Sequence, residues 1–97
     1  MSRRSQMEIY IDILKAVAEG RRRPTHVMCR ANLSWTRLKR YIDFLASQDL
    51  IREEEEEGTI IFSLTQKGRD VISYFRRIEG DLYKRKRIIP SEVYVRP

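Results

Sequence analysis

Cysteine, histidine and long apolar runs are all scarce in this chain of 97 residues. Cys29 is the only cysteine, so no disulfide can form within the chain, and we expect a reducing compartment. No stretch approaches the roughly 18 consecutive apolar residues that a membrane-spanning helix requires. Near the start, Glu8, Asp12 and Lys15 interrupt the apolar positions, which is not the pattern of a signal sequence. We therefore expect a soluble, cytoplasmic protein with no membrane partner.

The sequence also lacks the residue sets that catalysis and structural metal sites need. No nucleophile, general base and orienting acid can be recognised together, and no glycine-rich phosphate loop is present. His26 and Cys29 are spaced for one face of a helix, but two ligands fall short of a structural zinc site, and no further cysteine or histidine exists. We expect no enzyme activity, no metal, no cofactor and no small-molecule substrate.

Charge is abundant and unevenly distributed in this single-domain chain. The formal net charge is +6, and 35% of the residues are charged. Residues 1–48 carry ten Lys/Arg against four Asp/Glu, residues 49–66 carry one against six, and residues 67–97 carry nine against four. Two basic segments thus flank an acidic one, and the basic excess favours a polyanionic partner. The abundance of Glu and Arg, with little Gln, Asn or Cys, leans toward a thermophile.

The first part of the chain has helical patterns. Ser5 and Glu8 have the spacing of a capping box, which predicts a helix from Gln6 to Glu19 that ends at Gly20. Pro24 and Thr25 indicate the entry to a shorter helix, with Thr25 as its cap. Asn32 then tolerates a left-handed backbone, so the short connection to Ser34 is typical of a helix-turn-helix.

The stretch from Leu33 to Leu50 predicts a capped helix with two different faces. Ser34 is a good N-cap, and the apolar positions recur at helical spacing: Leu38, Tyr41, Ile42 and Leu45. The other face carries Thr36, Lys39, Arg40, Asp43 and Ser47, with Trp35 and Arg37 on the flanks. Such a helix suits the DNA major groove, and the alternative is a solvated amphipathic helix.

The period changes after Asp49. Residues 50–52 and Thr59 to Leu64 predict two short strands, with residues 53–58 as a polar turn between them and Ile60, Phe62 and Leu64 on one face. Thr65 is placed to cap a long final helix that runs to about Lys86, with Gly80 as a point of fraying or bending. The segment from Ile88 to Pro97 is expected to be an extended tail.

A heptad-like apolar seam runs along one face of the expected final helix. Its members are spaced by four, three and four residues: Val71, Phe75, Ile78 and Leu82. A helix that projects from a small domain cannot bury this stripe along its full length against its own core. The seam therefore predicts a homodimer.

The order helix, helix, turn, helix, strand, strand, helix is that of a winged helix-turn-helix, an α+β fold that is mostly α. Residues 31–45 (ANLSWTRLKRYIDFL) and 64–68 (LTQKG) resemble the archaeal ten-kilodalton winged-helix DNA-binding proteins described from Sulfolobus. The resemblance implies a recognition helix over residues 35–48 and a C-terminal helix that pairs two subunits as an antiparallel coiled coil. We divide the chain into a DNA-binding domain (1–66), a dimerisation helix (67–87) and a tail (88–97).

Two groups of residues are the candidates for DNA contact. The first lies on the presumed recognition helix: Trp35, Thr36, Arg37, Lys39 and Arg40. The second is the loop Arg21, Arg22 and Arg23, whose alternative reading is a solvated loop. Trp35 could equally be a packing residue, and Asp43 would repel phosphate unless it pairs with Lys39. The run Lys84 to Arg87 is either a phosphate-binding arm or a response to the helix macrodipole.

The acidic run Glu53 to Glu57 conflicts with a wing that contacts phosphate. We expect the wing tip to stand clear of DNA, or to pair with a basic cluster on a neighbouring subunit. Taken together, the sequence predicts a nucleoid-associated, homodimeric protein that binds double-stranded DNA as a transcriptional regulator or a chromatin-type architectural protein. The alternative is a winged helix that binds proteins through its acidic wing and its last helix.

Overall fold

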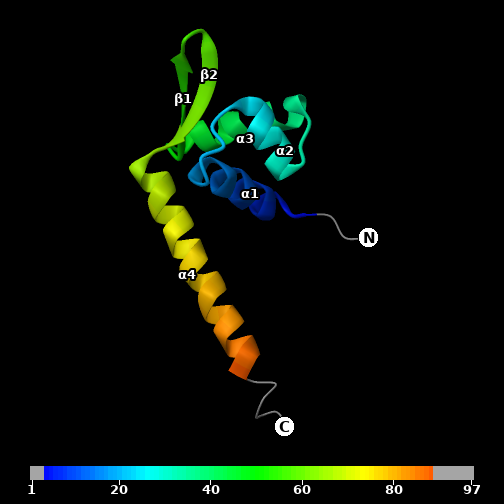
Figure 1. Ribbon diagram of the computed structural model, residues 1–97, viewed down its shortest axis with the longest axis vertical. Helices are drawn as coiled ribbons and strands as arrows, with labels where there is room; N and C mark the ends of the chain where they lie inside the picture. The colour runs from blue at the N-terminus through cyan, green and yellow to red at the C-terminus, as the bar shows by residue number, and fades with distance from the viewer. Residues whose placement is uncertain (1–3, 89–97) are drawn as a thin grey trace.

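The computed structural model describes the backbone of residues 4–88 and the side chains of residues 4–82. Its elements are α1 (Gln6–Ala18), α2 (Pro24–Ala31), α3 (Trp35–Ser47), β1 (Ile51–Glu56), β2 (Thr59–Leu64) and α4 (Gln66–Ile88). The first three helices gather at the base of the hairpin, and α4 projects away from them (Figure 1). The predicted α+β winged helix-turn-helix fold is confirmed.

Local signals in the sequence set most of the helix boundaries. At α1, the Ser5 hydroxyl accepts from the Glu8 N–H at 3.1 Å while the Ser5 N–H donates to the Glu8 carboxylate at 2.7 Å, so the capping box is formed. Asn32 ends α2 with a φ of 58°, as expected for a left-handed turn. The expected cap at Thr25 is wrong: Arg23 is the N-cap, and Pro24 occupies the first helical position because its fixed φ and missing N–H suit that place.

The core lies between α1, α2, α3 and the base of the hairpin. Its members with 2% exposure or less are Ile13, Leu14, Ala16, Val27, Ala31, Leu38, Ile42, Leu45, Ile51 and Phe62. The apolar stripe of α3 is therefore fully used for packing, while Tyr41 is half-buried at its edge. Burying an aliphatic or aromatic side chain of this size contributes roughly 1.5–3 kcal/mol. The opposite face of α3 is largely exposed to solvent and takes no part in the core.

The hairpin is more regular than the sequence predicts. β1 and β2 pair antiparallel from Ile51 opposite Leu64 to Glu56 opposite Thr59, so the strand continues through residues expected in a turn. Only Glu57 and Gly58 turn the chain, both with positive φ. The low β-propensity of glutamate is overridden because β2 supplies the hydrogen-bonding partner while the glutamates remain in solvent. Beyond the core, Ile60 near the tip is 43% exposed.

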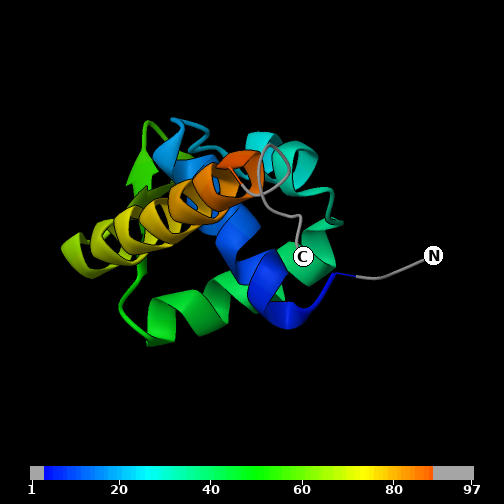
Figure 2. The same cartoon turned by 90° about the horizontal axis from the view of Figure 1, so that it is seen from below.

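Helix α4 begins at the expected cap and passes beside α1. The Thr65 hydroxyl accepts from the Gly68 N–H at 2.9 Å and donates to the Asp49 carbonyl at 2.6 Å. The helix continues through Gly80 to Ile88, so Gly80 does not end it. Lys15 of α1 pairs with Glu79 at 3.0 Å, and its ammonium lies 5.3 Å from the centre of the Phe75 ring. In the view from below in Figure 2, α4 crosses in front of α1.

The expected seam divides into two halves. Val71 and Phe75 are partly buried against the core of their own chain, whereas Ile78 is 45% exposed and Leu82 is 54% exposed. Ile72, one position off the seam, is buried at 3% exposure. Among the helices of the described residues, none is long and apolar enough to cross a bilayer.

Candidate nucleic-acid interface

The outward face of α3 presents polar and cationic side chains on a rigid support. Ser34 caps the helix by accepting from the Arg37 N–H at 3.3 Å, which fixes where the first turn begins. Thr36, Arg37 and Arg40 are exposed, and Trp35 is 42% exposed at the helix N-terminus. Because the opposite face is packed into the core, these side chains are held at a defined angle to the domain. We call them, with Lys39, the α3 face.

Arg37 and Arg40 are the unneutralised cations of the α3 face. Within residues 4–82, no carboxylate lies within ion-pair distance of either guanidinium. A planar guanidinium offers several N–H donors in a fork that fits guanine or phosphate oxygens. These two side chains can therefore meet an external anion without first breaking an internal pair.

Lys39 is held by two carboxylates of its own chain. Its ammonium lies 3.0 Å from Asp43, one helical turn on, and 3.6 Å from Glu53 of β1. These neighbours raise the pKa of Lys39, chiefly through the hydrogen bond to Asp43 and then through the charge of Glu53. The pairing of Asp43 with Lys39 agrees with the expected condition, but the pairing with Glu53 was not foreseen. Lys39 stays charged and links α3 to the wing.

The three arginines before α2 do not act as one cluster. Arg21 lies 3.4 Å from Glu19, and Arg22 lies 3.7 Å from Glu54 while also donating to the Phe62 carbonyl at 3.3 Å. The Phe62 N–H in turn donates to the Arg22 carbonyl at 2.8 Å, which ties this loop to the edge of β2. Arg23 is exposed and has no ion pair within the described residues. Arg22 therefore binds the hairpin, whereas Arg23 faces solvent.

The acidic wing is partly neutralised from both sides. Successive residues of a strand point to opposite faces of the sheet, so Glu53 faces α3 and Glu54 faces the loop before α2. Each meets one cation there, Lys39 and Arg22 respectively. No alternation in the sequence signals these pairs, because residues 53–57 are all glutamate and were expected in a turn. Only the pairing of β1 with β2 places Glu53 and Glu54 on opposite faces. Glu55, Glu56 and Glu57 remain exposed near the tip.

Other expected features bear less directly on this surface. His26 and Cys29 are both exposed, and the part of the chain with described side chains holds no group of three or more residues suited to a metal. The side chains of Lys84 to Arg87 and the tail beyond Ile88 lie outside the described residues.

Comparisons with known proteins agree with this geometry. A family model described as winged helix-turn-helix matches residues 3–82. An uncharacterised protein from Methanocaldococcus jannaschii is 38% identical over 71 residues, covering 73% of this chain and 69% of the relative. Sso10a-2, a DNA-binding protein from Sulfolobus solfataricus with a known crystal structure, is 27% identical in sequence to this chain. The two structures superpose with a TM-score of 0.63, and the match covers 91% of this chain and 95% of that one.

A fourth comparison supports the fold alone. The transcriptional regulator BldR from Sulfolobus solfataricus has a TM-score of 0.68 at 21% identity, covering 90% of this chain and 63% of that one. At this identity only the shared arrangement of helices and wing is informative. This shared arrangement of helices and wing holds the α3 face outward from the core.

Proposed function

The chain belongs to the winged helix-turn-helix family, and from this premise we propose that it is a homodimeric double-stranded-DNA-binding protein. It would act in the nucleoid as a transcriptional regulator or a chromatin-type architectural protein. The observation that carries the proposal is the α3 face, where Arg37 and Arg40 are exposed with no carboxylate partner among the described residues. The likeness to Sso10a-2, which is described as a DNA-binding protein, supports it.

In the proposed complex, α3 enters the major groove with its N-terminal end leading. Trp35 and Thr36 would then lie nearest the bases or the phosphates, since the first turn of a helix also offers free backbone N–H groups. Arg37 and Arg40 would bind guanine edges or phosphate oxygens, and Lys39 a phosphate. Of the loop before α2, Arg23 is best placed to reach the backbone, because Arg21 and Arg22 are already paired.

The competing function is a protein-binding module that uses the exposed glutamates of the wing tip. The two functions differ in their response to salt. Fluorescence anisotropy with a random-sequence duplex at about 50 mM and about 200 mM salt should show affinity falling steeply, because each neutralised phosphate contributes roughly 0.9 to the logarithmic slope. A chain that fails to bind the duplex at the lower salt concentration would support the protein-binding function instead.

The dimer is proposed to form through the outer half of the α4 seam. Ile78 and Leu82 expose apolar surface on the part of α4 that projects beyond the core, and Tyr74 beside them is 67% exposed. Val71 and Phe75 contribute less, since they already pack against α1 and its surroundings. The dimerisation helix of the proposal, residues 67–87, therefore joins the DNA-binding domain at its inner half and offers a partner surface at its outer half.

The variants Ile78→Glu and Leu82→Glu are expected to convert the dimer to a monomer. Each places a charge where an apolar contact is proposed, and an unpaired buried charge costs more than such a contact contributes. Multi-angle light scattering measures the mass, and Arg77→Glu, which puts the same side chain off the seam, should leave it dimeric. Phe75→Glu is a poorer test because Phe75 also packs in its own chain. An unchanged mass in both seam variants would refute this interface.

Glu53→Gln is expected to strengthen binding to the duplex by about threefold at low salt, since it removes a carboxylate that competes with phosphate for Lys39. The matched control is Glu56→Gln, which removes the same charge near the wing tip, where no ion pair is formed within the described residues. Anisotropy titrations of both variants give the comparison. Equal affinities for the two variants would show that the contact with Lys39 does not matter.

A further inference from the structure

Three aromatic rings meet where side chains of α1 and α3 come together, on the flank of α3 turned away from the wing. They are Tyr10 of α1 with Tyr41 and Phe44 of α3, and we call them the aromatic patch. The Tyr10 and Phe44 rings are stacked, with centroids 4.9 Å apart and planes inclined by 19°. Tyr41 meets the Tyr10 ring edge-on at 5.4 Å. Both arrangements are favourable for aromatic pairs, so the rings support one another.

Phe44 is the exposed member of the aromatic patch. Its exposed fraction is 43%, and because Tyr10 covers one face of the ring, the exposed surface belongs to the other face and the edges. Met7, one turn before Tyr10 on α1, is 63% exposed and extends the apolar surface. An incomplete core does not explain this exposure, since the residues that α3 turns to the core are at most 1% exposed: Leu38, Ile42 and Leu45.

Two cations without carboxylate partners lie beside the aromatic patch. Arg40 precedes Phe44 by four residues and Arg37 precedes Tyr41 by four, so each pair shares one side of α3, with Cβ atoms roughly 5–6 Å apart. Arg37 and Tyr41 also line the same surface depression near the start of α1. Neither guanidinium has a carboxylate within ion-pair distance among residues 4–82. A ligand that combines a flat apolar face with negative charge would use both kinds of group.

The nearby carboxylates are turned away or already paired. Glu8 and Asp12 flank Tyr10 at two residues' distance, which places them on the far side of α1. Glu8 accepts from the Ser5 N–H at 2.7 Å, and Asp12 pairs with Arg4 at 2.7 Å. Asp43 of α3 pairs with Lys39 on the side of the wing. The surroundings of the aromatic patch are therefore cationic.

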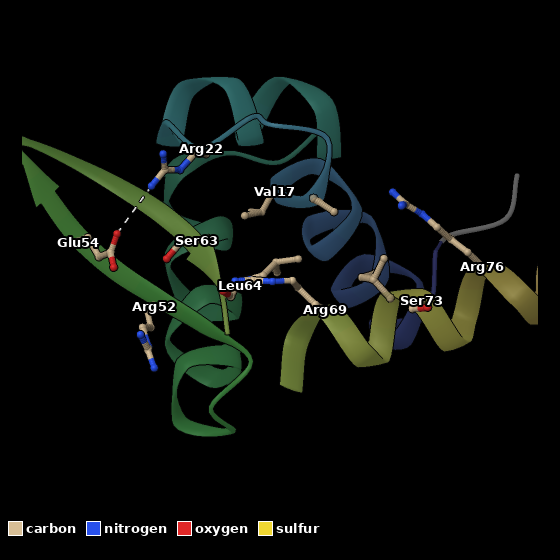
Figure 3. A pocket seen from close by; sticks show the side chains of 11 residues that line it. Val17, Arg22, Arg52, Glu54, Ser63, Leu64, Arg69, Ser73 and Arg76 are labelled. Carbon is tan, nitrogen blue, oxygen red and sulfur yellow. Dashed lines mark hydrogen bonds and ion pairs between the residues drawn. The ribbon is translucent and has the colours of Figure 1, made fainter. Parts of the chain in front are cut away.

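A second surface rich in arginine lacks this combination. In the groove between the hairpin and α4, Arg52 and Arg76 stand on opposite sides, and Arg22 is paired with Glu54 at 3.7 Å (Figure 3). None of the described residues that line this groove is aromatic. Free guanidiniums next to an exposed ring thus distinguish the flank of α3 from the groove.

We propose that the aromatic patch binds single-stranded DNA, with one base stacked on the exposed face of Phe44 and the adjoining phosphates on Arg37 and Arg40. An unpaired base has a free π-face and a phosphate on either side, and proteins bind single strands by combining aromatic rings with cations. A base inside a duplex has both faces covered by its neighbours, so Phe44 cannot stack on it. The flat ring backed by Tyr10 suits a base better than an aliphatic side chain of a protein partner.

This site extends the proposed function and shares part of its surface. Arg37 and Arg40 belong to the α3 face that is proposed to bind the duplex, whereas Phe44 does not. A strand released from a duplex at the α3 face would lie next to the aromatic patch, and for this reason we assign the site to DNA and not to RNA. Only that choice of nucleic acid rests on the proposed function.

The test titrates the full-length chain into a fluorescent oligodeoxyuridine of about 12 nucleotides, within the range that single-strand sites span, and follows anisotropy. Phe44→Ala should weaken binding about tenfold, as the loss of one stacked base does. Phe44→Trp should bind at least as well as the wild type. Phe44→Leu should be as weak as the alanine variant, because it keeps apolar contact with Tyr10 but has no ring.

Ile60→Ala is the matched control, since Ile60 is also 43% exposed but lies on the wing. It should bind the strand as the wild type does, and circular dichroism confirms that every variant is folded. Binding of a random-sequence duplex should change by less than about twofold in Phe44→Ala, because stacking is not available in the duplex. Wild-type affinity for the strand in Phe44→Leu, or equal losses for strand and duplex in Phe44→Ala, would overturn the proposal.

A photochemical crosslink locates the base directly. Irradiation of the complex with a strand that carries 5-iododeoxyuridine, followed by mass spectrometry of the peptides, should place the crosslink on Phe44. A crosslink on Trp35 instead would overturn the site, and tenfold tighter binding of oligouridine would overturn its assignment to DNA.

The same titrations separate this inference from the proposed duplex binding. A chain that binds the duplex and not the single strand would remove the inference alone. A chain that binds the single strand and not the duplex would remove the proposed duplex function and support the aromatic patch.

Discussion

Replacing Arg37, Lys39 and Arg40 together with alanine is expected to weaken binding to a random-sequence duplex by about 100-fold at low salt, because each lost contact of this kind contributes roughly 1 kcal/mol or more. The slope of log affinity against log salt concentration should also fall by about one unit for each phosphate contact removed. Arg37 and Arg40 carry most of the effect, since Lys39 is shared with Asp43 and Glu53. Fluorescence anisotropy over a range of salt concentrations measures both quantities.

The singly substituted Arg40→Ala and Arg77→Ala form the matched pair for this prediction. Both remove one exposed guanidinium and change the net charge equally, but Arg77 lies on α4 and not on the α3 face. The first should lower affinity by about tenfold, as one charged contact does, and the second should have little effect. Equal losses in the two variants would mean that net charge, not the α3 face, governs binding.

Gly68→Ala is expected to destabilise the fold by about 3 kcal/mol, the upper part of the range for overpacking, because the obstacle here is main chain and not a flexible side chain. A Cβ atom at this position would clash with the Leu50 carbonyl oxygen. That oxygen accepts from the Thr65 N–H at 3.1 Å, so moving it also disturbs the junction where α4 begins. Urea denaturation followed by circular dichroism measures the free energy of unfolding.

Gly80→Ala is the internal control for the same substitution. Gly80 lies in the same helix with nothing within 4 Å of the added Cβ, so alanine there should stabilise the helix by up to about 1 kcal/mol. The two substitutions thus have opposite expected signs. A Gly68→Ala variant as stable as the wild type would show that the close approach of α4 to Leu50 is not required.

Most of the fold could be predicted because its signals are local. The capping box at Ser5, the left-handed Asn32, the caps at Ser34 and Thr65 and the apolar stripe of α3 all depend on residues within a few positions of each other. The extent of the wing could not be predicted in this way. Strand structure over the glutamates depends on pairing with β2, and propensity alone favoured a turn.

Which cationic side chains have a carboxylate partner also depends on contacts between residues distant in sequence. From the sequence, Arg22 and Arg23 were equivalent loop residues, and Lys39 differed from Arg40 only by its possible pairing with Asp43. The fold brings Glu54 to Arg22 and Glu53 to Lys39, which leaves Arg23 and Arg40 without carboxylate partners among the described residues.

A nitrogen-15 NMR titration with a short duplex tests most directly whether DNA binds at the α3 face. The proposal predicts that the largest shift changes fall on residues 35–40, together with the guanidinium signals of Arg37 and Arg40. Shift changes confined to the wing or to α4, with the signals of α3 unmoved at saturating duplex, would contradict it.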